Sequence, residues 1–185
     1  KAIRRQRQMC IRDRSMKDPR FQETLIYMIE HGKGGATGIV VNRPIGMTLQ
    51  SLFTQYSFPR KVEEMPVFWG GPVAPHQGIF LHPDEKLWMR SMRSGPGVVT
   101  TVSVDIFDDI LKGTGPSNFL CAVGYAGWAV GQLEDELGRE DWLVAPFNKE
   151  ILFEMPYQMK YDAALAELGI DVNQFKSMEG IVGHA

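Results

Sequence analysis

The alternation of apolar and polar residues along the chain predicts strands and helices that are interleaved. Residues 24–30 and 38–41 are rich in β-branched and apolar side chains and flank a glycine-rich stretch, which predicts a hairpin with a loop from Gly32 to Thr37. Residues 66–83 contain two more apolar runs, separated by glycines and prolines that are typical of turns. Residues 97–102, 142–147 and 151–155 also predict strands. The run from Asn118 to Trp128 is too apolar for the edge of a sheet and predicts a central strand.

Four segments carry the signals of helices. Thr48 is expected to cap a short helix at residues 48–53. Residues 103–113 predict a longer helix, with Ser103 as its N-cap, one apolar face and a glycine at its end. A short acidic helix is predicted at residues 131–138, and a last helix from Pro156 to Gly169. Because there is no regular βαβ repeat and no linker, the predicted fold class is mixed α/β (α+β): a single compact domain with a mixed, largely antiparallel sheet flanked by short helices.

Composition limits the class of protein further. The chain has 185 residues, of which 44% are hydrophobic, so it has enough apolar surface to form a core without disulfides or metals. No apolar run approaches the roughly 20 residues of a membrane span. Cys10 and Cys121 are far apart and belong to no Cys/His cluster, which excludes a disulfide framework and a four-ligand zinc site. We therefore expect a cytoplasmic protein with no membrane association.

The stretch "RRQRQMCIRDRS" at residues 4–15 differs from the rest of the chain. Residues 1–14 hold six basic residues and one acidic residue, which leaves 14 basic and 21 acidic residues, a net charge of −7, for residues 15–185. The stretch allows three interpretations: a basic arm that binds nucleic acid, a presequence, or foreign sequence of the kind produced by translating a sequencing adapter. We favour the third. The predicted organisation is a non-native leader at residues 1–15 and a single domain at residues 16–185.

Signatures of catalysis are missing from the sequence. It contains no phosphate-binding loop, dinucleotide fingerprint, hydrolase elbow, HExxH helix or EF-hand loop. We therefore assign no catalytic residue, metal or cofactor. An enzyme hypothesis stays open in which His31 or His82 acts as a base beside Glu134 or Glu136, and it requires a histidine and a carboxylate that converge in a cleft. The alternative is that both histidines satisfy nearby backbone groups at strand ends.

The most distinctive stretch is "GYAGWAVGQLEDEL" at residues 124–137. Its glycines would let a backbone or an anionic ligand approach closely, and Tyr125 and Trp128 would form the walls of a pocket. Alternatively, the glycines allow a tight strand turn and the aromatic rings fill the core. Arg43 is placed to clamp a carboxylate or a phosphate, or else to form a structural ion pair. The binding hypothesis expects Tyr125, Trp128 and Arg43 to line one pocket.

An ordered set of motifs resembles the AlgH/YqgE family of bacterial proteins. The motifs are "DPRFQETLIYMIEH", "GATGIVVNRP", "VFWGGPV", "GIFLHP", "GYAGWAVGQLEDEL", "WL", "ILFE" and "GHA", and they span about Met16 to Ala185. Members of this family begin with an apolar strand of the kind "FLIAMP", for which this chain has "QMCIRDRS". The resemblance therefore implies that the chain lacks an edge strand or a pairing partner for "TLIYMIE".

The resemblance implies a compact AlgH-like α/β domain without an established activity, although some members carry the label of transcriptional regulator. The candidate ligand-binding positions that match family motifs are His31, Asn42, Arg43, Trp69, Gly70, Gly71, Gly124, Tyr125, Gly127, Trp128 and Gln132. The acidic body argues against direct binding of nucleic acid. The sequence thus predicts a cytoplasmic binding or regulatory module that acts through a small molecule or a protein partner. An undescribed enzyme, perhaps hydrolytic, is the alternative, and a DNA-binding regulator is the third hypothesis.

Overall fold

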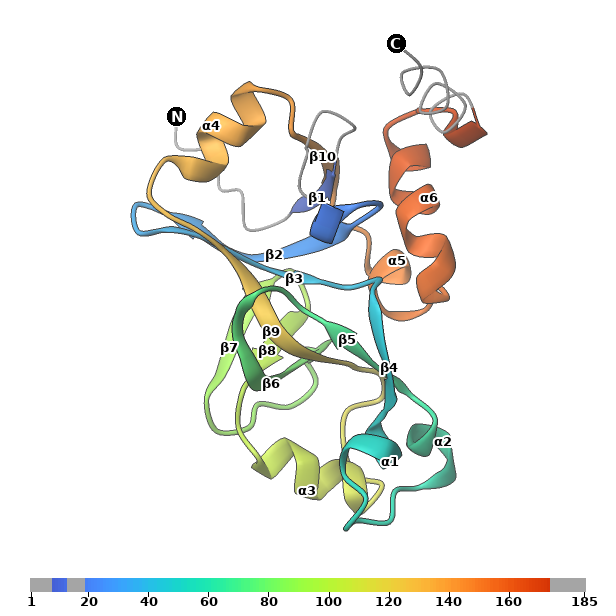
Figure 1. Ribbon diagram of the computed structural model, residues 1–185. Helices are drawn as coiled ribbons and strands as arrows, with labels where there is room; N and C mark the ends of the chain where they lie inside the picture. Colours follow the sequence, from blue (N-terminus) through green and yellow to red (C-terminus); the bar gives the residue numbers. More distant parts are fainter. Residues whose placement is uncertain (1–7, 13–18, 174–185) are drawn as a thin grey trace.

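The computed structural model describes residues 8–12 and 19–173, and its fold is a curled ten-stranded sheet with short helices around it (Figure 1). The strands are β1 (Gln8–Arg12), β2 (Leu25–Gly32), β3 (Gly35–Val40), β4 (Pro44–Thr48), β5 (Pro66–Trp69), β6 (Val73–Pro83), β7 (Ser91–Gly95), β8 (Val98–Thr101), β9 (Leu120–Trp128) and β10 (Trp142–Pro146). The helices are α1 (Leu49–Leu52), α2 (Arg60–Glu63), α3 (Asp105–Leu111), α4 (Gln132–Gly138), α5 (Lys149–Phe153) and α6 (Tyr157–Glu167), with a 3-10 turn η1 at Pro19–Phe21. This is the mixed, largely antiparallel architecture that the sequence predicts.

The sheet has the strand order β10-β1-β2-β3-β9-β6-β8-β7, with β4 and β5 beside this path. The predicted hairpin is confirmed: β2 and β3 pair antiparallel, and Gly32 opposite Gly35 closes a tighter turn than expected. β9 is the predicted central strand. It pairs with β6 on one side; on the other it pairs with β5 over Cys121–Val123 and with β3 over Ala126–Trp128. This change of neighbour along β9 positions the candidate site.

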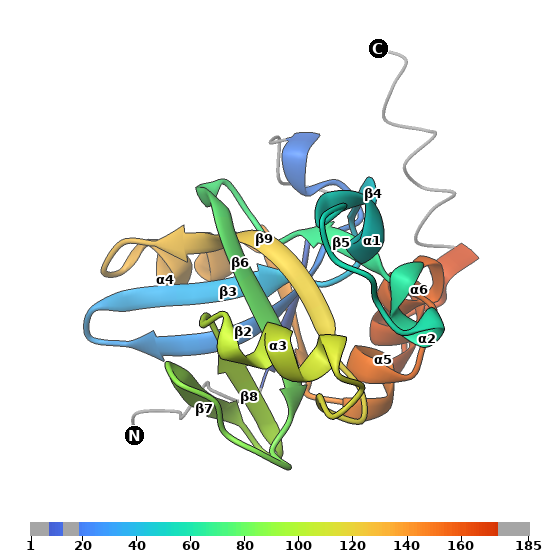
Figure 2. The same cartoon turned by 90° about the horizontal axis from the view of Figure 1, so that it is seen from below.

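Three apolar clusters form the core. One lies between the sheet and α5 and α6, a second lies beneath α4, and a third joins α1 and α3 to β5, β6 and β9. The helices α1, α2 and α3 lie together at the lower end in Figure 1 and face the viewer in Figure 2, which is seen from below. Over the described ranges, no helix is long and apolar enough to cross a membrane.

The segment Gln8–Arg12 is part of the sheet, contrary to expectation. It forms β1 between β2 and β10, and Met9, Cys10 and Ile11 are buried. The expectation that "TLIYMIE" lacks a pairing partner is therefore wrong, and residues 8–12 belong to the sheet. The physical reason is that a strand between two others is buried on both faces, and three consecutive apolar residues can occupy it whatever their origin. Residues 1–7 and 13–18 lie outside the described residues, and the foreign origin of the leader stays a prediction.

Two local predictions fail. Residues 151–155 do not form a strand, because Asn148 accepts hydrogen bonds from the backbone N–H groups of Glu150 and Ile151 and so starts α5. An apolar run of this length fits either a buried strand or a buried helix turn. Ser103 is not an N-cap either: α3 begins after Val104, and the Ser103 hydroxyl contacts Asp105 and the carbonyl of Met89.

The other helix signals hold. Thr48 caps α1 in a reciprocal pair with Ser51, as the capping-box pattern requires. The predicted acidic helix is α4, and its Leu133 is 1% exposed. The last predicted helix is α6, which buries Tyr161, Ala164 and Leu165. The strands β4 and β7 carry no clear signal because they are short and largely exposed, and the helix α2 carries none because it has only four residues.

Candidate ligand-binding site

Three of the candidate glycines have a structural role. The chain passes from β5 across β9 to β6 at Gly70 and Gly71, directly over Gly124. A Cβ at Gly70 would lie 2.1 Å from the Gly124 carbonyl oxygen, and one at Gly71 would lie 2.1 Å from the Tyr125 carbonyl carbon. A Cβ at Gly124 would lie 2.4 Å from the Gly71 oxygen. These glycines let two backbones cross, which is the structural reading of this motif rather than the ligand-binding one.

Gly127 has no such reason to be glycine. Its backbone is ordinary strand within the regular β3–β9 ladder, and a Cβ there would make normal contacts of 3.6 Å with the Tyr125 ring and the Val73 side chain. Glycine inside a strand is less stable than alanine by about 0.5–1 kcal/mol, so its presence marks either a bulge or a place where something approaches the backbone. No bulge occurs at Gly127.

The bare backbone of Gly127 is part of a hollow of about 320 Å³ at the β2–β3 hairpin. Its lining comes from the hairpin, from the start of β6 and from the end of β9: Glu30, Gly34, Gly35, Ala36, Thr37, Val73, Tyr125, Gly127 and Trp128. Tyr125 and Gly127 are two residues apart and therefore lie on the same face of β9, whereas Trp128 packs on the opposite face beneath α4. The hollow therefore contains three of the sequence-predicted residues. Glu30 and Val73 were missed, because cross-strand neighbours cannot be read from a single strand.

Trp128 is held by a carboxylate. Its indole N–H donates to Glu136 over 2.8 Å, and the N–H of Trp142 donates to the same oxygen over 2.7 Å. The side chain of Gln132 donates to the other Glu136 oxygen over 2.9 Å. Glu136 is thus occupied in fixing two rings and the start of α4, and it is not available as a catalytic acid. Gln132 is likewise a structural residue.

His31 and Glu134 do come together. The His31 ring nitrogen Nε2 lies 2.5 Å from Glu134 Oε1, and the side chains are 8% and 49% exposed. The pair links the β2–β3 hairpin to α4. The enzyme hypothesis requires such a pair in a cleft. Neither residue lines the hollow at the hairpin, nor the two hollows beside α6 and between α2 and α3.

Asn42 and Arg43 lie elsewhere. Asn42 accepts from the Leu25 N–H over 2.9 Å and donates to the Glu23 carbonyl over 2.8 Å, so it holds the start of β2 and the residues before it next to the end of β3. The Arg43 guanidinium lies 5.7 Å from the centre of the Trp69 ring and contacts the Arg20 carbonyl. Both residues line a separate polar hollow of about 350 Å³ beside α6. The expectation that Arg43, Tyr125 and Trp128 share one pocket is therefore wrong.

His82 is a core histidine. It is fully buried, its Nδ1 lies 2.9 Å from the Pro83 carbonyl oxygen, and its Nε2 lies 2.8 Å from the Thr101 hydroxyl. Because a carbonyl only accepts, Nδ1 carries the proton and Nε2 accepts from Thr101. Burial lowers the pKa of His82. No substrate reaches this ring, so the structure leaves it no role as a base.

This burial predicts a pH effect on stability. Between pH 6.5, the ordinary value for histidine, and the lower folded pKa of His82, the unfolded chain binds more protons than the folded one. The stability that the buried, neutral His82 ring contributes is fully present above pH 6.5 and is lost as the pH falls below that value. In urea unfolding, the wild type should lose more stability than His82→Gln between pH 7 and pH 5.5, because only the wild type has this buried ring to protonate. Equal losses would contradict this account of His82.

The remaining candidates for chemistry are inert or exposed. Burial raises the pKa of the Cys121 thiol to about 12, which removes it as a nucleophile. His76 is exposed on β6, and His184 lies outside the described residues. Within residues 8–12 and 19–173, no group of three His, Cys, Asp or Glu side chains gathers to hold a metal ion.

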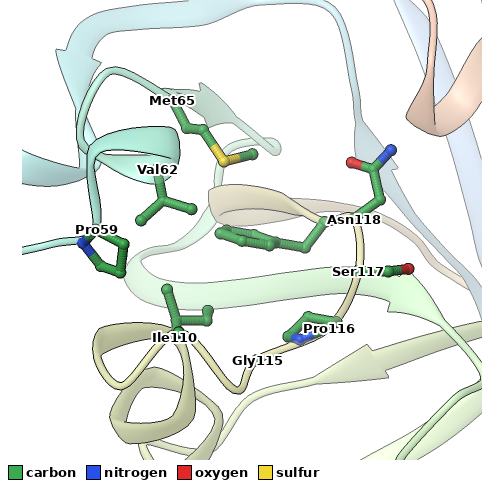
Figure 3. A pocket seen from close by; sticks show the side chains of 10 residues that line it. Pro59, Val62, Met65, Ile110, Gly115, Pro116, Ser117 and Asn118 are labelled. Atoms are coloured by element: carbon green, nitrogen blue, oxygen red, sulfur yellow. The ribbon is translucent and has the colours of Figure 1, made fainter.

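A further hollow was not predicted from the sequence. It has a volume of about 450 Å³ and lies between α2, the end of α3 and the loop before β9 (Figure 3). Its wall includes the apolar side chains of Val62, Met65 and Phe119 together with polar groups of the loop. Because its lining comes from short helices and a loop, no periodic pattern in the sequence indicates it.

Comparisons with known proteins agree on one family. A family model, DUF179, described as AlgH-like, matches residues 9–173, which includes most of β1. A "UPF0301 protein" of Nitrosococcus oceani is 40% identical over 92% of this chain and 91% of its own length, and one of Stutzerimonas stutzeri is 41% identical over 92% and 90%. The solution structure of the AlgH protein from Pseudomonas aeruginosa superposes with a TM-score of 0.79 at 32% identity, covering 100% of this chain and 96% of that one. A crystal structure of a Corynebacterium diphtheriae protein shares the fold at 17% identity, with a TM-score of 0.67 over 86% of this chain and 85% of that one.

Proposed function

The chain belongs to the AlgH-like family, and we propose that this member is a binding module that recognises a basic, extended segment of a protein partner in the Gly127 hollow. The observation that carries the proposal is Gly127 itself. It is a strand glycine that neither backbone conformation nor space requires, and it lies between the Tyr125 ring and the Val73 side chain. A partner backbone or a flat side-chain group lying on this surface would explain the missing side chain.

Charge supports a basic occupant. Glu30 is exposed on the rim of the hollow, and its carboxylate makes no hydrogen bond or ion pair within the described part of the chain. Residues 15–185 carry a net charge of −7, and the acidic first turn of α4 packs beside the same hairpin. An arginine from a partner would stack its guanidinium on the Tyr125 ring and pair with the Glu30 carboxylate. The same charge disfavours nucleic acid as the partner.

The proposal describes regulation by binding and includes no reaction. A cytoplasmic location fits it, because both cysteines are buried free thiols that need no oxidising compartment. The enzyme hypothesis keeps one supporting observation, the His31–Glu134 pair, but that pair opens on no described hollow and has no nucleophile assigned to it.

The test uses N-acetyl-arginine amide as a probe, with N-acetyl-citrulline amide as a neutral probe of the same shape. We expect the arginine probe to shift the NMR signals of the amides of Gly35, Tyr125 and Gly127, with a dissociation constant of the order of 1 mM. Glu30→Gln should weaken this binding by up to about fivefold, the effect of one exposed ion pair. Equal binding of both probes, or shifts confined to other strands, would refute the proposal.

A further inference from the structure

The hollow in Figure 3 is separate from the Gly127 hollow, and the two share no lining residue. Val62 and Met65 form one wall, Ile110 at the end of α3 forms another, and Pro116 closes the side formed by the loop (Figure 3). Its volume of about 450 Å³ lies within the range of about 300–1,000 Å³ in which proteins bind small molecules. The lining combines apolar side chains with the two polar side chains of Ser117 and Asn118.

Two of the lining residues are held in the core before anything binds. Ile110 and Phe119 are 2% and 4% exposed, because they belong to the apolar cluster beneath α1 and α3. The loop lies close to α3 at Gly115, where a Cβ would be 2.8 Å from the Ile110 side chain. A preformed apolar hollow needs little reorganisation to bind a ligand, so less of the binding free energy is lost.

The two polar side chains differ in what they leave free. The Ser117 hydroxyl and N–H are both engaged by the Glu85 carboxylate. Asn118 donates its Nδ2 to the Phe153 carbonyl over 2.9 Å, which orients its amide. Its Oδ1 is left as an acceptor without a hydrogen-bond partner among the described residues, at the rim of the hollow (Figure 3).

The Glu85 carboxylate lies at this end of the hollow, and the positive charge of Lys149 acts on it. The hydrogen bonds from Ser117 lower the pKa of the Glu85 carboxyl, which keeps it ionised near neutral pH. The free acceptor of Asn118 favours a ligand that carries a hydrogen-bond donor.

We propose that this hollow is a binding site for a small, flat, apolar molecule that carries an N–H or O–H donor. The ring lies against Val62, Met65 and Phe119, and the donor reaches Asn118 Oδ1. This inference does not depend on the Gly127 hollow.

The test compares two probes of nearly the same shape, indole, which has an N–H donor, and benzofuran, which has an acceptor oxygen in its place. Titration of the intact protein by NMR should show both probes shifting the amides of Ile110 and Phe119, with indole bound about fivefold more tightly, the effect of one hydrogen bond. Equal affinities would overturn the donor assignment, and shifts at neither residue would overturn the site.

Val62→Trp fills the hollow and should abolish the indole shifts, whereas Val104→Trp, at a position 83% exposed and outside the hollow, should leave them unchanged. Val62→Phe is the milder variant if Val62→Trp does not fold, and it should weaken indole binding at least about tenfold through lost volume. Retained indole binding in a folded Val62 variant would contradict the proposal.

Discussion

Gly124→Ala is expected to lower the free energy of unfolding by at least about 3 kcal/mol, the sum of a left-handed backbone penalty and a forced backbone displacement. Gly124 has a φ of +73°, and its added Cβ would lie 2.4 Å from the Gly71 oxygen and 3.0 Å from the Val73 oxygen. Neither atom is at the end of a flexible side chain, so the crossing of the chain over β9 would have to open. For a domain of this size the melting temperature should fall by about 10 °C.

Gly131→Ala is the matched control. Gly131 has a similar φ of +79°, but a Cβ there would meet nothing within 4 Å. Gly131→Ala adds only the strain of a left-handed backbone and should lower the free energy of unfolding by about 1 kcal/mol. Thermal or urea unfolding of both variants measures the difference. Equal losses would mean that the close crossing at Gly71 and Gly124 does not contribute to stability.

Ile11→Asp is expected to have the larger effect and to prevent folding. Ile11 is 0% exposed and pairs with Leu25 on one side and Leu143 on the other. An aspartate there loses the apolar contacts and buries a carboxylate without a partner, at a cost of at least about 5 kcal/mol. This is comparable to the whole stability of many domains, about 5–15 kcal/mol. Circular dichroism and amide NMR spectra should show an unfolded chain.

Ile11→Val controls for position and should cost only about 0.5–1.5 kcal/mol. The comparison also tests the role of residues 8–12, which belong to the segment that is predicted from the sequence to be a non-native leader. If Ile11→Asp were as stable as the wild type, residues 8–12 would not be part of the sheet. The expected loss would establish β1 as structural whatever its origin.

The leader illustrates why part of the fold escapes prediction from sequence. Its basic composition set residues 1–15 apart, yet Met9, Cys10 and Ile11 are a short apolar run that the gap between β2 and β10 accepts. Composition is an average over the segment, whereas strand pairing depends on a few residues and on neighbours far away in sequence. The hairpin and β9 were predictable because their own residues carry the signal. The short helix α5 was not, since three adjacent apolar residues suit a buried strand equally well.

In the candidate site, too, the role of a residue depends on spatial neighbours that its local sequence does not indicate. Gly124 and Gly127 are three residues apart in one glycine-rich motif, and the sequence gives them the same possible roles. The structure separates them, because a Cβ at Gly124 would meet the crossing backbone whereas one at Gly127 would make ordinary contacts. Glu30 and Val73 reach the hollow from strands paired in space, and nothing in their local sequence marks them.

The most direct test of the central claim is the titration of Gly127→Val with N-acetyl-arginine amide, together with its urea unfolding curve. A valine at this strand position relieves the flexibility of glycine and fills the hollow beside Tyr125. The account predicts that Gly127→Val is as stable as the wild type or more stable by up to about 1 kcal/mol. It also predicts that this variant binds the probe at least about tenfold more weakly. A valine variant that binds the probe as well as the wild type would show that the hollow is not the binding site. A loss of stability of more than about 1 kcal/mol would show that Gly127 is needed for packing.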